Sequence, residues 1–516
     1  MNRWILVATA LAVATPSAAH AGGLFLPGMG PQGQARAGAF VAKADDPSTM
    51  AHNPAGFAKL DHTVAFVGIN LVKMSLKFER AGTYEPTGDG LPYEGEEYPA
   101  VENDASPSPG IAGFQAIPTI VVSTDLGKPE LPFRFAIGFY APQAFAAREF
   151  ADTVTLANGV EAPAPQRYDA AIQKGKAAYP SIAASYSPLD NLHVGARFSS
   201  GFSFIEVTKI VWAIRNYDEY NEKDSTTVIE ASDLFVPTYG AGVLWAPTRH
   251  IEIGAAWNSA ANVHAVGDLS STTGSAVPDG NELRPNDGTP VCADGSDVGA
   301  IKTCIDFTLP QTASVGARWV FRDGAGLEAG DVELDVKWED WSAGSITQNT
   351  SDALHPNGQL LEPSRIEHGF QDVISVRLGG SYVIPLGSNS LTLRAGVAHD
   401  TKTAPVSWTR VDQDSKPRTM FATGIAYQGD AWRVDVGGGI IVEPDRTVSH
   451  DCQEPAGPSQ TSPGCDGDGD TPLPEREAPD PAQPLAGTNG LLESPFNAGT
   501  YESGYVLMHL GFSAWF

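Results

Sequence analysis

Hydrophobic and polar residues alternate in blocks along most of the chain from Thr63 onward. In Val332–Glu339 (VELDVKWE), charged side chains occupy one face and large apolar side chains the other. The segments Leu192–Phe198 and Ile251–Asn258 follow the same pattern. Because successive side chains of a β-strand point to opposite faces, this period of two predicts strands with two unlike faces.

The alternating blocks predict about fourteen strands, an even number as bacterial outer-membrane barrels require. The expected strands lie near residues 63–78, 114–123, 132–140, 180–187, 191–203, 234–246, 250–258, 308–321, 331–342, 372–384, 390–400, 417–428, 431–443 and 501–516.

The lengths of the connections between these strands distinguish a membrane barrel from a soluble sandwich. Short connections at 188–190, 247–249, 385–389 and 429–430, and somewhat longer ones at 125–131 and 322–330, alternate with long polar ones at 79–113, 141–179, 259–307, 343–371 and 444–500. A barrel with tight periplasmic turns and large extracellular loops produces this alternation, whereas a sandwich gives no reason for it. We therefore predict an all-β fold, a transmembrane antiparallel β-barrel whose apolar faces point outward to lipid.

The last predicted strand supports a membrane-facing stripe. Its apolar face consists of Val506, Met508, Leu510, Phe512, Ala514 and Phe516, so the sequence ends on an aromatic residue. Aromatic residues near predicted strand ends are typical of the interfacial girdles of such barrels. Candidates are Tyr186, Trp245, Trp257, Trp341 and Trp432.

The first residues have the form of a secretory signal. A short basic stretch precedes an apolar run from Trp4 to Ala14, and Ala19-His20-Ala21 has the small-x-small form of a cleavage site. We expect a signal peptide at 1–21, with the mature protein starting at Gly22. The alternative is an uncleaved anchor, but the run is well short of the roughly 20 residues that a spanning helix needs.

The charge balance argues against a nucleic-acid partner. The sequence has 33 Lys+Arg against 61 Asp+Glu, a formal net charge of −28, whereas phosphate binding needs basic patches. The acidity is that of solvated surface loops.

The cysteines come as two close pairs in polar stretches, Cys292 with Cys304 and Cys452 with Cys465. Each pair is expected to close a small loop as a disulfide in an oxidising compartment. Metal ligation is disfavoured because neither pair has CxxC spacing or a companion His. We expect no metal and no cofactor.

Residues 22–60 do not alternate and are rich in small residues and Pro. Such a segment cannot form a barrel strand, yet Phe40, Val41 and Met50 make it too apolar for a free tail. We predict that it folds inside the lumen as an N-terminal plug, or hatch, and that 61–516 form the barrel with its long extracellular loops.

A family resemblance appears in this segment. The run from Ala37-Gly38-Ala39-Phe40 through Ala44-Asp45-Asp46-Pro47-Ser48-Thr49 to Asn53-Pro54-Ala55-Gly56 resembles the hatch of the FadL/TodX outer-membrane transporters, which carries an Asn-Pro-Ala motif. Further matching stretches cover nearly the whole mature chain, at 140–142, 186–196, 245–248, 309–316, 338–342 and 394–400. Loops 79–113 and 444–500 look longer than is usual for the family, which leaves the identity of the ligand open.

The resemblance implies passive transport of long-chain fatty acids or other hydrophobic molecules, and no enzymatic activity. It implies hydrophobic capture loops outside, an apolar pocket against the hatch, and a lateral exit where a kinked third strand opens the wall. It also implies insertion by the outer-membrane barrel assembly machinery, surroundings of lipid and lipopolysaccharide, and a monomer.

Several residues are candidates for these parts. The stretch 202–214 is unusually apolar for an outer loop and is expected to form the capture surface, with loop packing as the alternative. The start of the hatch is expected to line the pocket, with packing inside the plug as the equal alternative. The candidate ligand-binding residues are Leu24, Phe25, Leu26, Phe204, Val211, Trp212 and Ile214.

Gly138 and Pro142 flank the end of the third strand, and both residue types interrupt a ladder, so we place the lateral opening there. Arg197, Arg377 and Arg394 are expected to point inward. One of them is a candidate receptor for a carboxylate head group, unless all of them pair with acids of the lumen.

Other readings are weaker. Asp466, Asp468, Asp470 and Glu477 imitate a calcium loop, but Thr471 stands where Gly is needed. A general porin would need an open lumen, against which the predicted plug argues. An outer-membrane phospholipase or an adhesin that uses the long acidic loops is the remaining alternative, and no Ser, His and acid share a recognisable motif.

Overall fold

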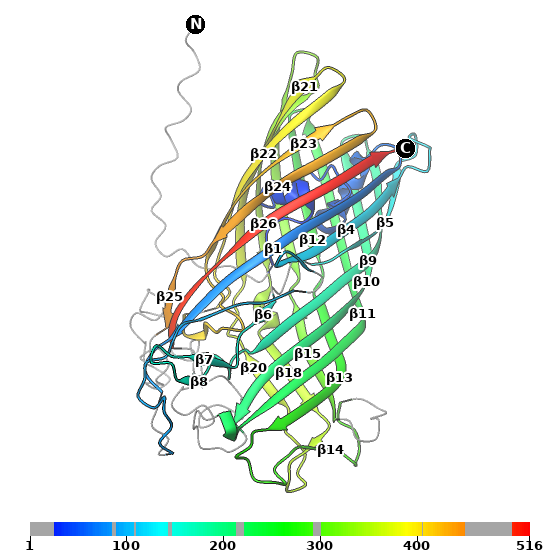
Figure 1. Ribbon diagram of the computed structural model, residues 1–516. Coiled ribbons are helices and arrows are strands. Elements are labelled where there is room, and N and C mark those ends of the chain that lie inside the picture. The colour runs from blue at the N-terminus through cyan, green and yellow to red at the C-terminus, as the bar shows by residue number, and fades with distance from the viewer. Residues whose placement is uncertain are drawn as a thin grey trace, which may run out of the picture.

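A computed structural model describes residues 25–84, 89–107, 110–142, 147–212, 221–292, 301–404, 406–448 and 498–516. Its main feature is a tall, closed antiparallel β-barrel (Figure 1). Fourteen strands form the wall: β1 (Val64–Arg80), β4 (Phe114–Thr124), β5 (Phe133–Tyr140), β9 (Ile172–Leu189), β10 (Leu192–Trp212), β11 (Asp224–Thr248), β12 (Ile251–Asn258), β16 (Thr312–Arg322), β17 (Glu328–Glu339), β21 (Val373–Leu386), β22 (Asn389–Asp400), β23 (Arg418–Gln428), β24 (Trp432–Val442) and β26 (Gly499–Trp515).

The barrel closes because β1 pairs with β4 on one side and with β26 on the other. All strand pairs are antiparallel, and tight turns join them at the end where β26 finishes (Figure 1). The predicted barrel of about fourteen strands is therefore confirmed. Tight turns mark the periplasmic end, and the long connections gather at the opposite, extracellular end.

The extracellular side of the wall is longer than the sequence predicted. The stretch 259–307 was expected to be loop, but it contains β13 (Ala261–Thr273) and β15 (Ile301–Leu309), which continue β12 and β16 outward. Likewise, β10 does not end near 203 but runs to Trp212, paired with β11. The cause is continued pairing, since β13 lies between β11 and β15.

Short elements decorate the extracellular half. The strands are β2 (Val101–Glu102), β3 (Gly110–Ile111), β6 (Arg148–Glu149), β7 (Thr153–Thr155), β8 (Glu161–Pro163), β14 (Arg284–Pro285), β18 (Ile346–Ser351), β19 (Ala353–Leu354), β20 (Ser364–Glu367) and β25 (Arg446–Val448). The 3-10 turns are η2 (Asn221–Lys223), η3 (Trp341–Gly344) and η4 (Val406–Trp408).

Side-chain burial is inverted relative to a soluble barrel. On β17, Val332, Leu334 and Val336 are 44%, 50% and 40% exposed, whereas the alternating Glu333 and Asp335 are buried inside. The apolar stripe thus faces outward, as lipid requires, and the charged face points into the lumen. Among the described residues, none of the helices has the length and apolar character of a membrane span.

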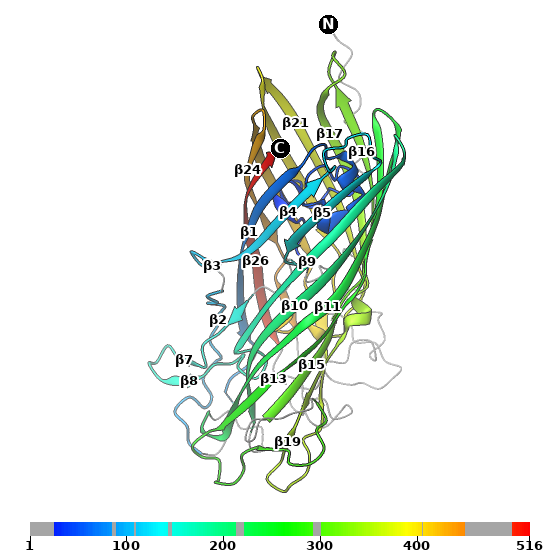
Figure 2. The same ribbon diagram turned by 90° about the vertical axis from the view of Figure 1, so that its right-hand side faces the viewer.

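Residues 25–60, named here the luminal segment, lie inside the barrel near its periplasmic end (Figures 1 and 2). They contain α1 (Gly30–Ala35), α2 (Thr49–His52) and η1 (Pro54–Lys59). Nearly every residue from Leu26 to Phe57 is buried. These helices are too short to be stable alone, so contacts with the wall must hold them in place.

Candidate functional site

Buried charges anchor the luminal segment to β17. The guanidinium of Arg36 lies 2.9 Å from both Asp331 and Glu333, and all three side chains are fully buried. Arg36 also donates to the hydroxyl of Ser381 at 2.6 Å. A buried ion pair of this kind holds its segment in place, because removing one partner leaves an uncompensated charge in the lumen.

The same strand binds the backbone of the luminal segment. Asp335 accepts hydrogen bonds from the backbone N–H groups of Phe40 and Val41 at 2.8 and 3.0 Å. Glu333 accepts one from Ala42 at 2.6 Å. The charged face of β17 that the sequence pattern identified is thus a binding surface for the chain's own N-terminal part.

Glycines on the inner wall let the backbone approach this closely. A Cβ at Gly396 of β22 would collide with the backbone of Arg36, and a Cβ at Gly254 of β12 would collide with the backbone of Val41. At these two positions the wall has no side chain, so the backbone of the luminal segment can lie directly against it.

The Asn-Pro-Ala motif forms a second junction between the luminal segment and the wall. Asn53 is fully buried, and its amide donates to the carbonyl of Val41 at 2.8 Å and to that of Val243 in β11 at 3.2 Å. Its side-chain oxygen accepts from the N–H of Ala55 at 3.2 Å and so caps η1, with Pro54 in the first turn. An Asn cap followed by Pro is the ordinary start of a helical turn, and here its other contacts tie that turn to the barrel.

His52 closes the luminal segment on itself. Its Nε2 lies 2.8 Å from the carbonyl of Met29 and 3.2 Å from its backbone nitrogen. Burial lowers the pKa of His52 to about 4, so the ring is neutral at ordinary pH.

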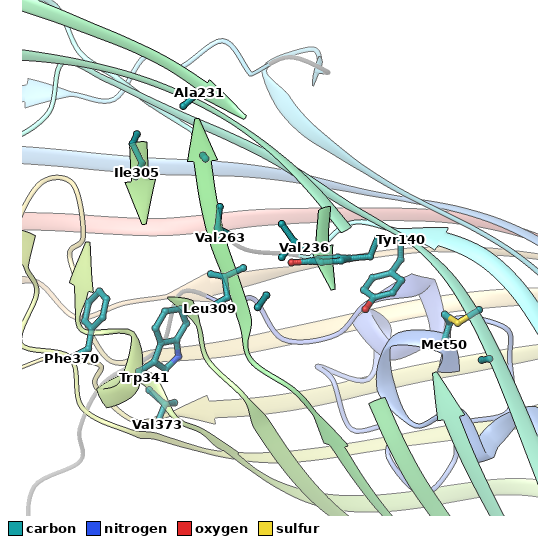
Figure 3. Close-up of a cluster of buried hydrophobic side chains, with 14 of the residues drawn as sticks. Met50, Tyr140, Ala231, Val236, Val263, Ile305, Leu309, Trp341, Phe370 and Val373 are labelled. Carbon is teal, nitrogen blue, oxygen red and sulfur yellow. The ribbon is translucent and has the colours of Figure 1, made fainter. Parts of the chain in front are cut away.

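A large cavity of about 1250 Å³ occupies the extracellular half of the barrel. Its apolar floor is formed by β11, β13, β15 and η3, and Figure 3 shows Trp341, Phe370, Leu309 and Val263 gathered there. Polar side chains such as Ser271 become frequent toward the extracellular ends of the same strands. The apolar lining residues include Ile205, Val207, Ile229, Val263, Leu269, Ile305, Phe307, Leu309, Trp341 and Phe370.

A small cavity of about 150 Å³ lies between the luminal segment and the wall. It shares Pro142, Tyr179 and Leu309 with the large cavity, so the two spaces are neighbours. Its walls include the cations Arg197 and Arg377.

These two arginines differ from other cations of the lumen in their partners. Arg197 donates to the backbone carbonyl of Met50 at 2.9 Å, and its Nε has no hydrogen-bond partner within the described chain. Among the described residues, Arg377 forms no ion pair, and its Nε is likewise buried without a partner. Arg394, by contrast, is paired with Asp435 at 2.6 Å. The small cavity is therefore a cationic site that adjoins the apolar large cavity.

The wall is incompletely paired beside both cavities. The short strand β5 pairs with β4 only as far as Tyr140–Thr119 and with β9 only as far as Tyr140–Tyr179 (Figure 2). Beyond Tyr140, Ala116–Pro118 of β4 and 174–178 of β9 face each other across an opening. In the described part of the chain, no strand fills this opening and pairs with both of them. Both stretches line the large cavity. We call this region the wall gap.

The comparisons with known proteins agree with this architecture. Residues 11–464 match the family model of the outer membrane protein transport protein (OMPP1/FadL/TodX). The chain belongs to this family. Its location is accordingly the outer membrane. No curated protein sequence matches the chain.

Solved FadL/TodX-family structures have the same fold. A Pseudomonas aeruginosa FadL homologue is similar with a TM-score of 0.69 at 17% identity, covering 96% of this chain and 100% of that one. The Pseudomonas putida toluene transporter TodX is similar with a TM-score of 0.60 at 13% identity, covering 96% and 100%. The Ralstonia pickettii toluene transporter TbuX is similar with a TM-score of 0.59 at 12% identity, covering 95% and 99%.

The structure places the candidate residues of this FadL/TodX-family chain in different parts of the barrel. Phe25 and Leu26 line the small cavity, and Pro142 lines both cavities at the wall gap. Gly138 lies in β5, where it is paired with β4 on one side and with β9 on the other, and a Cβ there would collide with the carbonyl of Ile120. Phe204 lies on the outer face of β10, 45% exposed, and does not line the cavity, whereas the alternating Ile205 does.

The remaining candidates lie partly outside the described residues. Val211 and Trp212 belong to β10. Cys292 and Cys304 form a disulfide with an S–S distance of 2.00 Å, which ties the connection after β14 to β15. Outside the described residues lie Leu24, Ile214, Cys452, Cys465 and the acidic run from Asp466 to Glu477.

The prediction that Trp341 lies at the membrane interface is wrong. The residue is 1% exposed and lies on the floor of the large cavity, where its indole N–H donates to Glu339 at 2.7 Å. The signal was present in the sequence, because alternation counted onward from the outward-facing Val336 places residue 341 on the inner face.

The sequence reasoning also missed the connection between β22 and β23. Its residues 403–416, named here the inner loop, are mostly buried, although the connection lies on the extracellular side. Arg410 binds Asp169 at 2.8 Å, and Arg148 lies 3.5 Å from Asp414. These ion pairs fold the inner loop back into the lumen, where Asp412 and Gln413 line the large cavity. Alternating hydrophobicity gives no signal for such a loop.

One carboxyl of the inner loop is strongly affected by this environment. Burial alone would raise the pKa of Asp412, but Arg410 at 3.1 Å outweighs it and the pKa of that carboxyl is lowered. Asp412 is therefore a carboxylate that faces the cavity. Among the described residues, no group of three or more His, Cys, Asp or Glu is placed to hold a metal ion.

Proposed function

We propose that this protein passes long-chain fatty acids and similar hydrophobic molecules inward across the outer membrane by diffusion. The observation that carries the proposal is the apolar cavity of about 1250 Å³ that reaches an unpaired part of the wall. The structural relatives that are described as toluene transporters and as a FadL homologue support a hydrophobic cargo.

The physical need for such a cavity follows from the cargo. Each CH₂ group that leaves an apolar surface for water loses about 0.8 kcal/mol, so a water-filled lumen would be a barrier to an acyl chain. A lumen with continuous apolar surface removes that barrier. Capture is assigned to residues 202–214, of which 202–212 form the extracellular end of β10, where Ile205 and Val207 line the large cavity.

The small cavity supplies a place for a polar head group. Arg197 and Arg377 line it, each with an Nε that no described residue binds, and a carboxylate is the ligand that a guanidinium binds best. The acyl chain would then lie in the large cavity, beyond the Tyr179 and Leu309 that both cavities share.

Exit is assigned to the wall gap, with the luminal segment as the hatch that blocks the direct path to the periplasm. Pro142 at the end of β5 borders both cavities, and the ladder hydrogen bonds that would seal the wall stop at Tyr140. A hydrophobic molecule that leaves sideways enters lipid and never crosses water. A general porin is disfavoured, because the anchored luminal segment occupies the lumen.

The test is uptake of labelled oleate by cells that produce the protein. Ala116→Trp fills the wall gap, and we expect it to retain oleate binding in purified protein but to lose most of the uptake. Ser271→Trp is the matched control, since it adds the same side chain to the large cavity on β13, away from the gap. Wild-type uptake by the Ala116→Trp variant would rule out exit through the gap, and no uptake by the folded wild type would rule out oleate as cargo.

A further inference from the structure

The floor of the large cavity contains an aromatic cluster with polar atoms that no described residue satisfies. His368 stacks on Phe370 with ring centroids 4.9 Å apart, and Phe370 meets Trp341 edge-on at 5.6 Å. All three side chains line the cavity and are more than nine-tenths buried. Figure 3 shows Trp341 and Phe370 side by side at this end of the cavity.

The polar atoms belong to His368 and to the neighbouring inner loop. The Nδ1 of His368 and the side-chain carbonyl oxygen of Gln413 are buried, and neither has a hydrogen-bond partner in the part of the chain that the structure describes. Both residues line the large cavity, and Asp412 connects them: it precedes Gln413 and lies 3.4 Å from His368 Nε2. The indole N–H of Trp341 in the same cluster is satisfied by Glu339, whereas the indole N–H of the neighbouring Trp408 has no partner among the described residues.

The roles of these atoms follow from their partners. In the neutral imidazole with its hydrogen on Nε2, toward the carboxylate of Asp412, the Nδ1 of His368 is an acceptor. The carbonyl oxygen of Gln413 is also an acceptor. A buried acceptor without a donor is destabilising, and a ligand that brings a hydrogen to donate removes that cost.

We propose that this cluster, His368, Gln413, Phe370 and Trp341, is a binding subsite for the hydroxyl group of a neutral apolar molecule, such as a phenol or a long-chain alcohol. The aromatic rings hold the apolar body, and His368 Nδ1 or Gln413 Oε1 accepts the hydrogen bond from the hydroxyl group. A carboxylate has no hydrogen to donate and would lie beside Asp412, so the acid head group belongs at Arg377 instead. The subsite rests on the proposed function, because it lies in the same cavity and extends its cargo to hydroxylated compounds.

The test compares 2-naphthol with naphthalene, which share a ring system and differ in the hydroxyl group. Binding of each to the full chain in lipid nanodiscs is measured by calorimetry, with oleate as a third ligand. A single hydrogen bond of ordinary strength predicts that 2-naphthol binds about tenfold more tightly than naphthalene.

Variants assign the preference to the subsite. His368→Phe and Gln413→Leu are each expected to reduce the preference for 2-naphthol by severalfold and to leave naphthalene and oleate binding unchanged. Thr227→Val, which removes a hydroxyl from the cavity wall on β11, is the matched control and should keep the preference. Using both variants guards against one of them failing to fold, which circular dichroism would reveal.

Two results would overturn the subsite. One is equal affinity of the wild type for 2-naphthol and naphthalene while oleate still binds, which leaves the proposed function intact. The other is an undiminished preference in both folded variants. If the folded wild type binds none of the three ligands, the subsite and the proposed function are both wrong.

Discussion

Replacing Arg36 by Ala tests whether buried charge holds the luminal segment in the barrel. The guanidinium is fully buried between Asp331 and Glu333 at 2.9 Å and also donates to Ser381 at 2.6 Å. Removing one partner of a buried ion pair costs about 3–5 kcal/mol. We expect the lower end, because Asp331 keeps Arg318 at 2.8 Å.

A cost of about 3 kcal/mol raises the ratio of undocked to docked luminal segment by more than about a hundredfold. Hydrogen exchange followed by mass spectrometry reads this ratio directly, since amides at 37–50 exchange only when the segment leaves the wall. We expect their exchange to accelerate by about two orders of magnitude, while the barrel strands remain protected.

The control is Arg322→Ala, which removes an exposed arginine whose contacts are with backbone carbonyls of Arg249 and Gly326 in the periplasmic turns. Exchange at 37–50 should then equal that of the wild type. If Arg36→Ala changes exchange there by less than threefold, the ion pairs do not hold the segment and the reasoning is refuted.

Three further predictions concern the same region. Arg377→Ala should weaken oleate binding about 10- to 100-fold, because it removes a charge-assisted hydrogen bond to the carboxylate. Calorimetry should show unchanged binding of 1-hexadecanol, which has no carboxylate. Equal losses for both ligands would contradict a head-group role for Arg377. Asn53→Ala removes the bonds to Val41 and Val243, so amide exchange at 41–56 should rise about tenfold, and unchanged exchange would show that the motif is not a junction. For His52, the lowered pKa of about 4 means that the docked state is fully stable above about pH 6.5 and loses up to about 3 kcal/mol as the pH falls toward 4. Ion conductance in planar bilayers should rise over that interval in the wild type but not in His52→Gln, and a rise of equal size in both would exclude His52 as the cause.

The barrel can be predicted from the sequence alone. A period of two is a local property, because each strand must present one face to lipid and one to the lumen whatever its neighbours are. Residues such as Glu333 and Leu334 therefore reveal their own orientation. Turn residues and the alternation of short and long connections then fixed strand order and sidedness, and Asn53-Pro54-Ala55 located the luminal segment.

Which inward-facing groups meet depends on the three-dimensional packing of the chain. Arg36 and Glu333 are 297 positions apart, and no local pattern distinguishes Arg377, which has no carboxylate partner among the described residues, from Arg394, which has Asp435. The inner loop likewise looks like any polar extracellular loop until Arg410 and Asp169 bring it into the lumen. Cavities arise from the packing of segments that are distant along the chain, and a periodic pattern records only the face on which each side chain lies.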